Sequence, residues 1–248
     1  SRKRSNKCAR ATRSLRRSRW NWATARKVAR RSFRRLRRCN SVSCCWRSRS
    51  QAAKSFKRRV KRVSDIAPTL DILARLIAFD TTSRNSNLEL IAWVEDFLRQ
   101  RGVGSRRVAN SDGTKANLYA SIGPEVGGGV VLSGHTDVVP VDDQPWASDP
   151  WVLTERGGKL YGRGTADMKS FIALTLAHVD AARTAALKRP IVLALSYDEE
   201  IGCLGAPSMI AELATQTNKP SAVIVGEPTS MKVVSAHKGV RSFIVEVI

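Results

Sequence analysis

The distribution of charge divides this 248-residue chain at about residue 64, and only the part after this point can fold around a core. Residues 1–64 hold 25 of the 43 Lys and Arg residues and no Asp or Glu, whereas the remainder carries 18 basic and 21 acidic residues. A segment of like charge with few apolar residues repels itself and buries too little surface to fold. We therefore expect residues 1–63 to be a disordered basic extension, with globular structure beginning at residue 64.

Three interpretations of residues 1–63 are open. Trp20, Trp22 and Trp46 lie among the arginines, and aromatic rings in a basic segment can stack on bases, so non-specific nucleic-acid contact is one. An organelle transit peptide is another, because such peptides are rich in Arg and Ser and poor in acidic residues. We favour the third, a non-native extension, because the composition changes abruptly where globular patterning begins.

Cysteine usage and hydropathy predict a cytoplasmic protein without membrane contact. Four of the five cysteines lie in the basic segment and only Cys203 lies in the remainder, which does not fit the disulfide framework of a secreted domain. No stretch approaches the roughly 18 to 20 apolar residues of a membrane span. No apolar run near the first residue resembles the core of a secretory signal.

From residue 68 onward, the spacing of apolar residues alternates between the period of helices and that of strands. Such alternation is typical of an α/β fold with a largely parallel sheet flanked by helices, which we expect over residues 64–235. Two strands then follow without a helix between them, which indicates that a second, more antiparallel unit starts there. The expected helices are 68–79, 87–101, 165 or 167 to about 183, and 206–214, and the expected strands are 116–122, 130–132, 191–196, 221–225, 232–236 and 241–248.

Acidic and imidazole side chains follow three of the expected strands. His135 and Asp137 follow the first, residues 199–200 (Glu-Glu) the second and Glu227 the third, while Asp167 lies where a loop enters a helix. Ligands bind at the carboxyl ends of parallel strands, and carboxylates that meet there need a cation between them. One imidazole with several carboxylates and no thiolate suits zinc, cobalt or manganese. Each cluster alone, however, is typical of a turn or a helix cap.

Four runs of sequence carry these clusters: VLSGHTDVVP (131–140), GRGTADMK (162–169), SYDEEIGCLG (196–205) and GEPTSMK (226–232). Their order and spacing resemble the M20 family of metallopeptidases and deacylases, over about residues 68–248. The resemblance implies that residues 64–235 are the N-terminal part of a di-zinc aminopeptidase-like catalytic domain. It implies that residues 236–248 start a smaller α+β lid and dimerisation domain, truncated here, so we expect the full-length protein to be a homodimer.

The resemblance assigns four side chains to two Zn²⁺ ions, for which Co²⁺ is an alternative. Asp167 bridges both ions. His135 and Glu227 complete the ligands of the first ion, and Glu200 binds the second.

The resemblance also assigns roles to two residues that do not bind metal. Glu199 is the general base, which takes a proton from water and passes it to the departing amine. Asp137 accepts a hydrogen bond from the second ring nitrogen of His135 and so orients the ring. The family has two further histidines, one for the second ion and one for the oxyanion, but neither motif occurs before Ile248, and His237 is assigned to neither role.

The resemblance implies a metal-dependent amide hydrolase whose substrate is a small N-acyl amino acid. Residues 165–169 and 196–203 are most similar to the acetylornithine deacetylase branch, whose members convert N2-acetylornithine and water to ornithine and acetate in arginine biosynthesis. Succinyl-diaminopimelate desuccinylases, aminoacylases and carboxypeptidase-like enzymes are alternatives within the family. An alternative of a different class is an inactive fragment whose basic segment binds nucleic acid.

Overall fold

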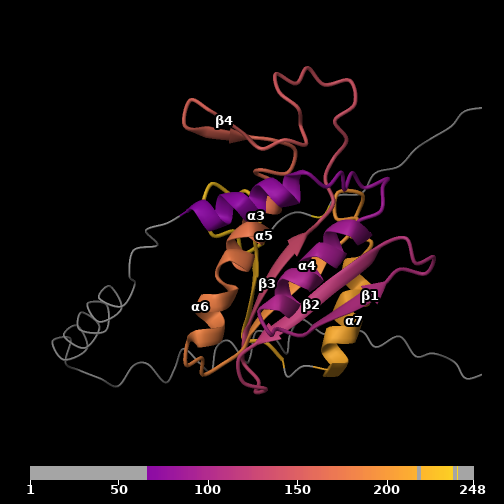
Figure 1. The fold of residues 1–248 in the computed structure, drawn as a ribbon. Helices are drawn as coiled ribbons and strands as arrows, with labels where there is room; N and C mark the ends of the chain where they lie inside the picture. The colour runs from indigo at the N-terminus through magenta and orange to yellow at the C-terminus, as the bar shows by residue number, and fades with distance from the viewer. Residues whose placement is uncertain (1–65, 217–218, 237–238, 240–248) are drawn as a thin grey trace, which may run out of the picture. The chain divides into compact units, whose positions relative to one another are not determined.

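The computed structural model describes residues 66–216, 219–236 and 239 (Figure 1). The predictions for residues 1–63, for His237 and for a strand at 241–248 lie outside the described residues. The prediction of a lid over residues 236–248 lies outside them too, apart from Ala236 and Gly239, which have no regular secondary structure.

A five-stranded sheet with the order β1-β2-β6-β3-β7 forms the centre of the described fold (Figure 1). β3 pairs in parallel with β6 and β7, whereas β2 pairs antiparallel with β6 and β1. Four of the five strands therefore run in one direction, which confirms the predicted largely parallel sheet. The strands are β1 (Ser105–Ala109), β2 (Ala116–Ile122), β3 (Val130–His135), β6 (Ile191–Ser196) and β7 (Ala222–Val225), and a separate hairpin joins β4 (Thr154–Arg156) and β5 (Lys159–Tyr161).

Helices pack against both faces of this sheet because successive side chains of a strand point to opposite sides. Leu118 and Ala120 of β2 belong to the apolar core that four helices share. Asn117 points the other way and donates a hydrogen bond of 3.1 Å to Ser208 of α7. No helix within the described residues is long and apolar enough to cross a membrane. The helices are α3 (Ala67–Ile77), α4 (Leu88–Gln100), α5 (Lys169–Ala177) and α6 (Val179–Thr184), which contribute to that core, and α7 (Ala206–Gln216).

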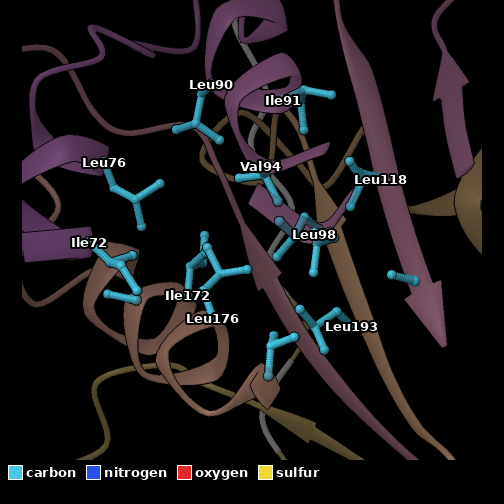
Figure 2. Packing of buried hydrophobic residues seen from close by; sticks show 14 of the residues in the cluster. Ile72, Leu76, Leu90, Ile91, Val94, Leu98, Leu118, Ile172, Leu176 and Leu193 are labelled. Atoms are coloured by element: carbon cyan, nitrogen blue, oxygen red, sulfur yellow. The ribbon is translucent and has the colours of Figure 1, made fainter. Parts of the chain in front are cut away.

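The core lies between α3, α4 and α5 and the strands β2 and β6 (Figure 2). Leu90, Val94 and Leu98 follow one another at the four-residue helical spacing of α4 and are 0% exposed. Leu118 of β2 and Ile172 of α5 are also 0% exposed. Burying a side chain of this size contributes about 1.5–3 kcal/mol, so this packing holds the strands whose ends carry the predicted site.

The predicted helix over residues 165–183 is wrong at its start and at its middle. The helix begins at Lys169, and it is interrupted at His178, where α5 ends and α6 starts. The ring nitrogen Nδ1 of His178 contacts the carbonyl oxygen of Leu174 at 2.7 Å, and the His178 N–H donates to Thr175 instead. The side chain thus occupies the carbonyl that the backbone N–H would bond in a continuous helix.

Three other differences concern strands, and one of them is the hairpin of β4 and β5, which the sequence pattern did not predict. Residues 232–236 form no strand, and their side chains are exposed. The sequence pattern did not predict β1, whose sequence SRRVA lacks a buried face and pairs with β2 at the edge of the sheet. An edge strand with exposed side chains has no apolar alternation from which to predict it.

Candidate metal centre

The carboxyl ends of three parallel strands lie side by side at one edge of the sheet. His135, the last residue of β3, stands opposite Ser196, the last residue of β6. On the other side of β3, Val225 ends β7 opposite Ser133. The segments that follow these strands therefore leave the sheet at the same edge, as expected for a ligand site in an α/β fold.

Asp167 reaches this edge from the loop that precedes α5. The next residue, Met168, is 0% exposed, and its Sδ lies 3.3 Å from the backbone nitrogen of His135. A Cβ at Gly134 would lie 3.0 Å from Met168 Cε, so the glycine allows the loop to approach β3. This close packing places Asp167 beside the end of β3.

Lys169 also fixes the loop that carries Asp167, by bonds to the end of α3 and the residues after it. Its side chain is 0% exposed, and its Nζ donates to the carbonyl oxygens of Leu76 at 3.0 Å and Phe79 at 2.8 Å. Burial lowers the pKa of Lys169 to about 7, although the charges of Asp80 and Asp137 act in the opposite direction. The side chain joins the start of α5 to the end of α3.

The three predicted ligands of the first metal ion, His135, Asp167 and Glu227, lie close together, and the predicted base Glu199 lies beside them. The Nε2 atom of His135 lies 3.0 Å from Asp167 Oδ1, 3.6 Å from Glu227 Oε1 and 3.8 Å from Glu199 Oε2. The ligand atoms of His135, Asp167 and Glu227 all lie within 4.8 Å of one another. The His135 side chain is 2% exposed, whereas those of Asp167 and Glu227 are 46% and 34% exposed, so the group opens to solvent on its carboxylate side.

The spacing and chemistry of this group fit a zinc ion. Ligand atoms about 2.0–2.2 Å from a tetrahedral Zn²⁺ stand roughly 3.4 Å apart, close to the 3.0 and 3.6 Å from His135 Nε2 to Asp167 and Glu227. A donor set of one imidazole and carboxylates, without thiolate, is compatible with Zn²⁺ and equally with Co²⁺ or Mn²⁺. Cys203, which contacts Glu199 Oε1 at 3.5 Å, is not a member of the group.

The structure places Glu200 near this group but not in it. Burial, followed by the charge of Asp167, raises the pKa of Glu200. Burial also raises the pKa of Glu227; the charge of His135 opposes this rise, and the charges of Asp167 and Glu199 add to it. Both carboxyl groups are thus partly removed from water and lie within reach of other carboxylates, two effects that disfavour their charged forms.

Asp137 lies beneath the group and connects the turn that carries Glu199 and Glu200 to the imidazole. Its Oδ1 accepts the Glu199 N–H at 3.0 Å and its Oδ2 accepts the Glu200 N–H at 3.2 Å. Ser83 Oγ donates to Oδ2 at 2.7 Å. The His135 Nδ1 lies 2.9 Å from the main-chain carbonyl oxygen of Asp137 and 3.5 Å from its carboxylate, so the carbonyl is the nearer acceptor. Nε2 therefore faces the carboxylates, as a ligand nitrogen must.

The electrostatics of the site favour a positive charge at His135. Burial lowers the pKa of His135, but the hydrogen bond and charge of Asp137 and the charges of Glu227 and Glu199 outweigh it and raise the pKa to about 9. For Asp137, burial raises the pKa, but the hydrogen bonds from His135, Ser83 and the Glu199 N–H outweigh it and lower the pKa. In the absence of a metal, a proton on the imidazole supplies the cation that the carboxylates require.

Comparisons with known proteins agree with this geometry. Residues 131–240 match the profile of the family described as Peptidase family M20/M25/M40. An acetylornithine deacetylase from Shigella sonnei (strain Ss046) is 42% identical over 185 residues, which make up 70% of this chain and 46% of that protein. Residues 131–240 of the chain belong to peptidase family M20. The match spans about half the length of that relative.

Solved structures of M20 enzymes share the fold. Human carnosine dipeptidase 1 superposes with a TM-score of 0.55 at 24% sequence identity, over 63% of this chain and 38% of that one. An M20 family metallo-carboxypeptidase from Sulfolobus solfataricus gives a TM-score of 0.56 at 21% identity, over 64% of this chain and 37% of the other. At these identities the likeness concerns the fold alone, and it confirms the predicted α/β fold with its mostly parallel sheet.

The M20 site contains residues that the sequence analysis did not single out. Ser83 lies 54 positions before Asp137, and a serine in a polar stretch gives no sign that it will bond a buried carboxylate. Lys169 stands within the run GRGTADMK, but a lysine in a helix is normally exposed, so its burial was not predicted. Only the three-dimensional fold shows that both residues support the segments that carry the candidate metal ligands.

Replacing Gly226 with alanine is expected to destabilise the fold and to displace Glu227. A Cβ at residue 226 would lie 2.0 Å from Cγ of Phe171, a ring of α5. Overpacking of this kind costs about 1–3 kcal/mol, which urea denaturation measures, and a parallel zinc titration should show weaker binding. Gly104→Ala is the matched control, because a Cβ there would meet nothing within 4 Å. Equal losses in both variants would contradict the packing argument.

Proposed function

We propose that this chain carries the metal-binding part of an acetylornithine deacetylase, which hydrolyses N2-acetylornithine to ornithine and acetate. The observation that carries the proposal is the convergence of His135, Asp167 and Glu227 within 4.8 Å, with Glu199 beside them. The narrower choice of substrate is supported by the 42% identity to the relative from Shigella sonnei. A small polar substrate also suits a group whose carboxylates are open to solvent.

Zinc is the metal that we propose, with cobalt as the alternative. His135, Asp167 and Glu227 would hold one ion, and Asp167 and Glu200 would contribute to a second. Metal ions held there would supply Lewis-acid chemistry, lowering the pKa of a water molecule and polarising the amide carbonyl. Burial, together with the charges of neighbouring carboxylates, raises the pKa of both Glu200 and Glu227, and a bound cation would offset both effects.

Glu199 is the proposed general base. Its carboxylate lies 3.8 Å from His135 Nε2, at the edge of the group, and is 37% exposed, so water and substrate can reach it. In hydrolysis it would accept one proton from the attacking water and deliver that proton to the ornithine nitrogen as the C–N bond breaks. The Glu199 N–H donates to Asp137 Oδ1 at 3.0 Å, and this hydrogen bond fixes the backbone of the proposed base.

Arginine biosynthesis, a cytoplasmic location and a homodimeric full-length protein form part of the same proposal. The pathway follows from the proposed substrate. The location is supported by the distribution of cysteines, of which Cys203 alone lies outside the basic segment.

A chimera tests the proposal, because the chain matches only 46% of its relative. The chain would be continued after Ile248 with the part of the Shigella sonnei protein that follows the matched region. Acetate release from N2-acetylornithine is then compared with succinate release from N-succinyl-diaminopimelate, with and without a chelator and added zinc. We expect metal-dependent hydrolysis and a kcat/KM at least about 100-fold higher for N2-acetylornithine, as for a site built around one substrate.

The outcomes separate the alternatives. A preference for the succinyl substrate would assign the chain to another M20 deacylase. Hydrolysis that survives complete removal of metal would contradict the metal centre itself. RNA or DNA binding that depends on residues 1–63, without hydrolysis by the chimera, would favour the binding function in place of the enzyme.

A further inference from the structure

Lys115 connects three segments that lie far apart in the sequence. It is the residue immediately before β2, and its Nζ lies 2.5 Å from Asp198 Oδ1, in the turn that follows β6. The same Nζ donates to the main-chain carbonyl oxygen of Ser83. The side chains of Lys115 and Asp198 are only 14% and 10% exposed, so this ion pair is largely removed from solvent.

Each partner of Lys115 belongs to a segment that donates hydrogen bonds to the carboxylate of Asp137. Ser83, whose carbonyl accepts from Lys115, uses its hydroxyl to donate to Asp137 Oδ2 at 2.7 Å. Asp198, the other partner, directly precedes Glu199 and Glu200, whose N–H groups donate to the same carboxylate at 3.0 and 3.2 Å. Lys115 therefore holds the two segments between which Asp137 is fixed.

The turn after β6 is closed by its own backbone, and Lys115 contacts it through Asp198. Asp198 has a φ of 55°, in the left-handed region, which Asp and Asn adopt more often than most residues other than glycine. Its carbonyl accepts the Leu204 N–H at 3.0 Å, which closes the turn. The buried carboxylate of Asp198 would face an acidic neighbourhood without compensation if the ammonium of Lys115 were removed, because Glu199 and Glu200 follow it directly.

We propose that Lys115 is a positioning residue for the metal centre, which acts through Asp198 and Ser83 to hold Asp137 and the Glu199–Glu200 turn in place. This rests on the proposed function only where it refers to metal. The hydrogen bonds from the two glutamate amides to Asp137 exist without metal, so they give an independent measurement.

Amide hydrogen exchange of the metal-free chain is the first test. Lys115→Met keeps the length of the side chain and removes its charge, and exchange of the Glu199 and Glu200 amides should become at least about tenfold faster as the turn opens locally. Amides in the middle of β6 should be unchanged. Asp198→Asn should give a similar effect, and the double variant should show no more than the larger single effect, because the two residues act as a pair. Lys115→Arg should restore slow exchange.

Zinc titration by calorimetry is the second test. Lys115→Met should weaken zinc binding by about 10–100-fold, the usual effect of losing a partner that orients metal ligands, and Lys115→Arg should recover most of it. The matched control is Arg107→Met, which breaks the ion pair between Arg107 and Glu95 away from the site. That variant should bind zinc as the unaltered chain does, even if its melting temperature falls as much as that of Lys115→Met.

The two tests distinguish a failure of this inference from a failure of the proposed function. If the unaltered chain binds no zinc, the proposed metal centre is wrong, while the exchange rates still decide the role of Lys115. If Lys115→Met leaves both the two amide exchange rates and zinc affinity unchanged, Lys115 is not a positioning residue. Loss of protection throughout the sheet in Lys115→Met, without rescue by arginine, would likewise assign it a general structural role.

Discussion

Replacing Glu199 with glutamine is expected to lower kcat for N2-acetylornithine by about 10²–10⁴-fold, the contribution of a general base, with zinc binding retained within a few-fold. Glutamine has nearly the same shape, but its amide cannot accept a proton from water. Glu199 lies 3.8 Å from His135 Nε2 and outside the group formed by His135, Asp167 and Glu227, so the ligands of the first ion stay in place. The measurement is steady-state hydrolysis by the chimera, with zinc titration of the same sample.

Two further variants show whether the loss of kcat with retained zinc binding is specific to Glu199. Asp167→Asn removes charge from the proposed bridging ligand and should weaken zinc binding by more than the roughly 10–100-fold that follows loss of an outer partner. Glu125→Gln alters an exposed carboxylate in the loop between β2 and β3 and should change neither quantity. Weak zinc binding by Glu199→Gln as well would show that Glu199 is a ligand and not the base.

Much of the fold follows from apolar spacing because most of its strands and helices bury at least one face. The strand predicted at 191–196 is β6 itself, and the helix predicted at 87–101 is α4 with one residue fewer at each end. The interruption at His178 was not predictable, since it depends on a ring nitrogen that bonds the Leu174 carbonyl. Apolar residues after β7 suggested a strand at 232–236, but these residues are exposed and pair with no strand in the described part of the chain.

The residues of the site could be predicted where they stand in short sequence motifs. They could not be predicted where their role depends on contacts between distant segments. His135, Asp167 and Glu227 are each marked by their runs, and the parallel register of β3 with β6 and β7 brings two of them to one edge. Lys115 lies 83 positions before Asp198. No spacing rule links two such residues, because the contact exists only after β2 has paired with β6.

The affinity of the metal-free chain for zinc is expected to rise about tenfold per pH unit between pH 7 and 9 and to level off above this range. The pKa of His135 is raised to about 9, so below this pH the imidazole carries a proton that zinc must displace. As the pH falls further, the raised pKa values of Glu200 and Glu227 add protons that must also leave, and the slope becomes steeper. Calorimetry at pH 7.5 in buffers of different ionisation enthalpy should show release of about one proton per zinc bound.

The raised pKa of His135 also predicts that, as the pH rises, the stability of the metal-free chain falls while its affinity for zinc increases. A raised pKa in the folded state means that His135 contributes stability fully below its ordinary value of 6.5, and that this contribution is lost as the pH rises toward 9. Zinc, which binds only the folded chain, should therefore raise the melting temperature more at pH 8.5 than at pH 7. His178→Ala is the control, because this histidine is exposed and its ring bonds the Leu174 carbonyl of α5, not the carboxylates around His135. Zinc binding without proton release at pH 7.5 would show that His135 is already neutral, and that the carboxylates do not hold the charge that we infer.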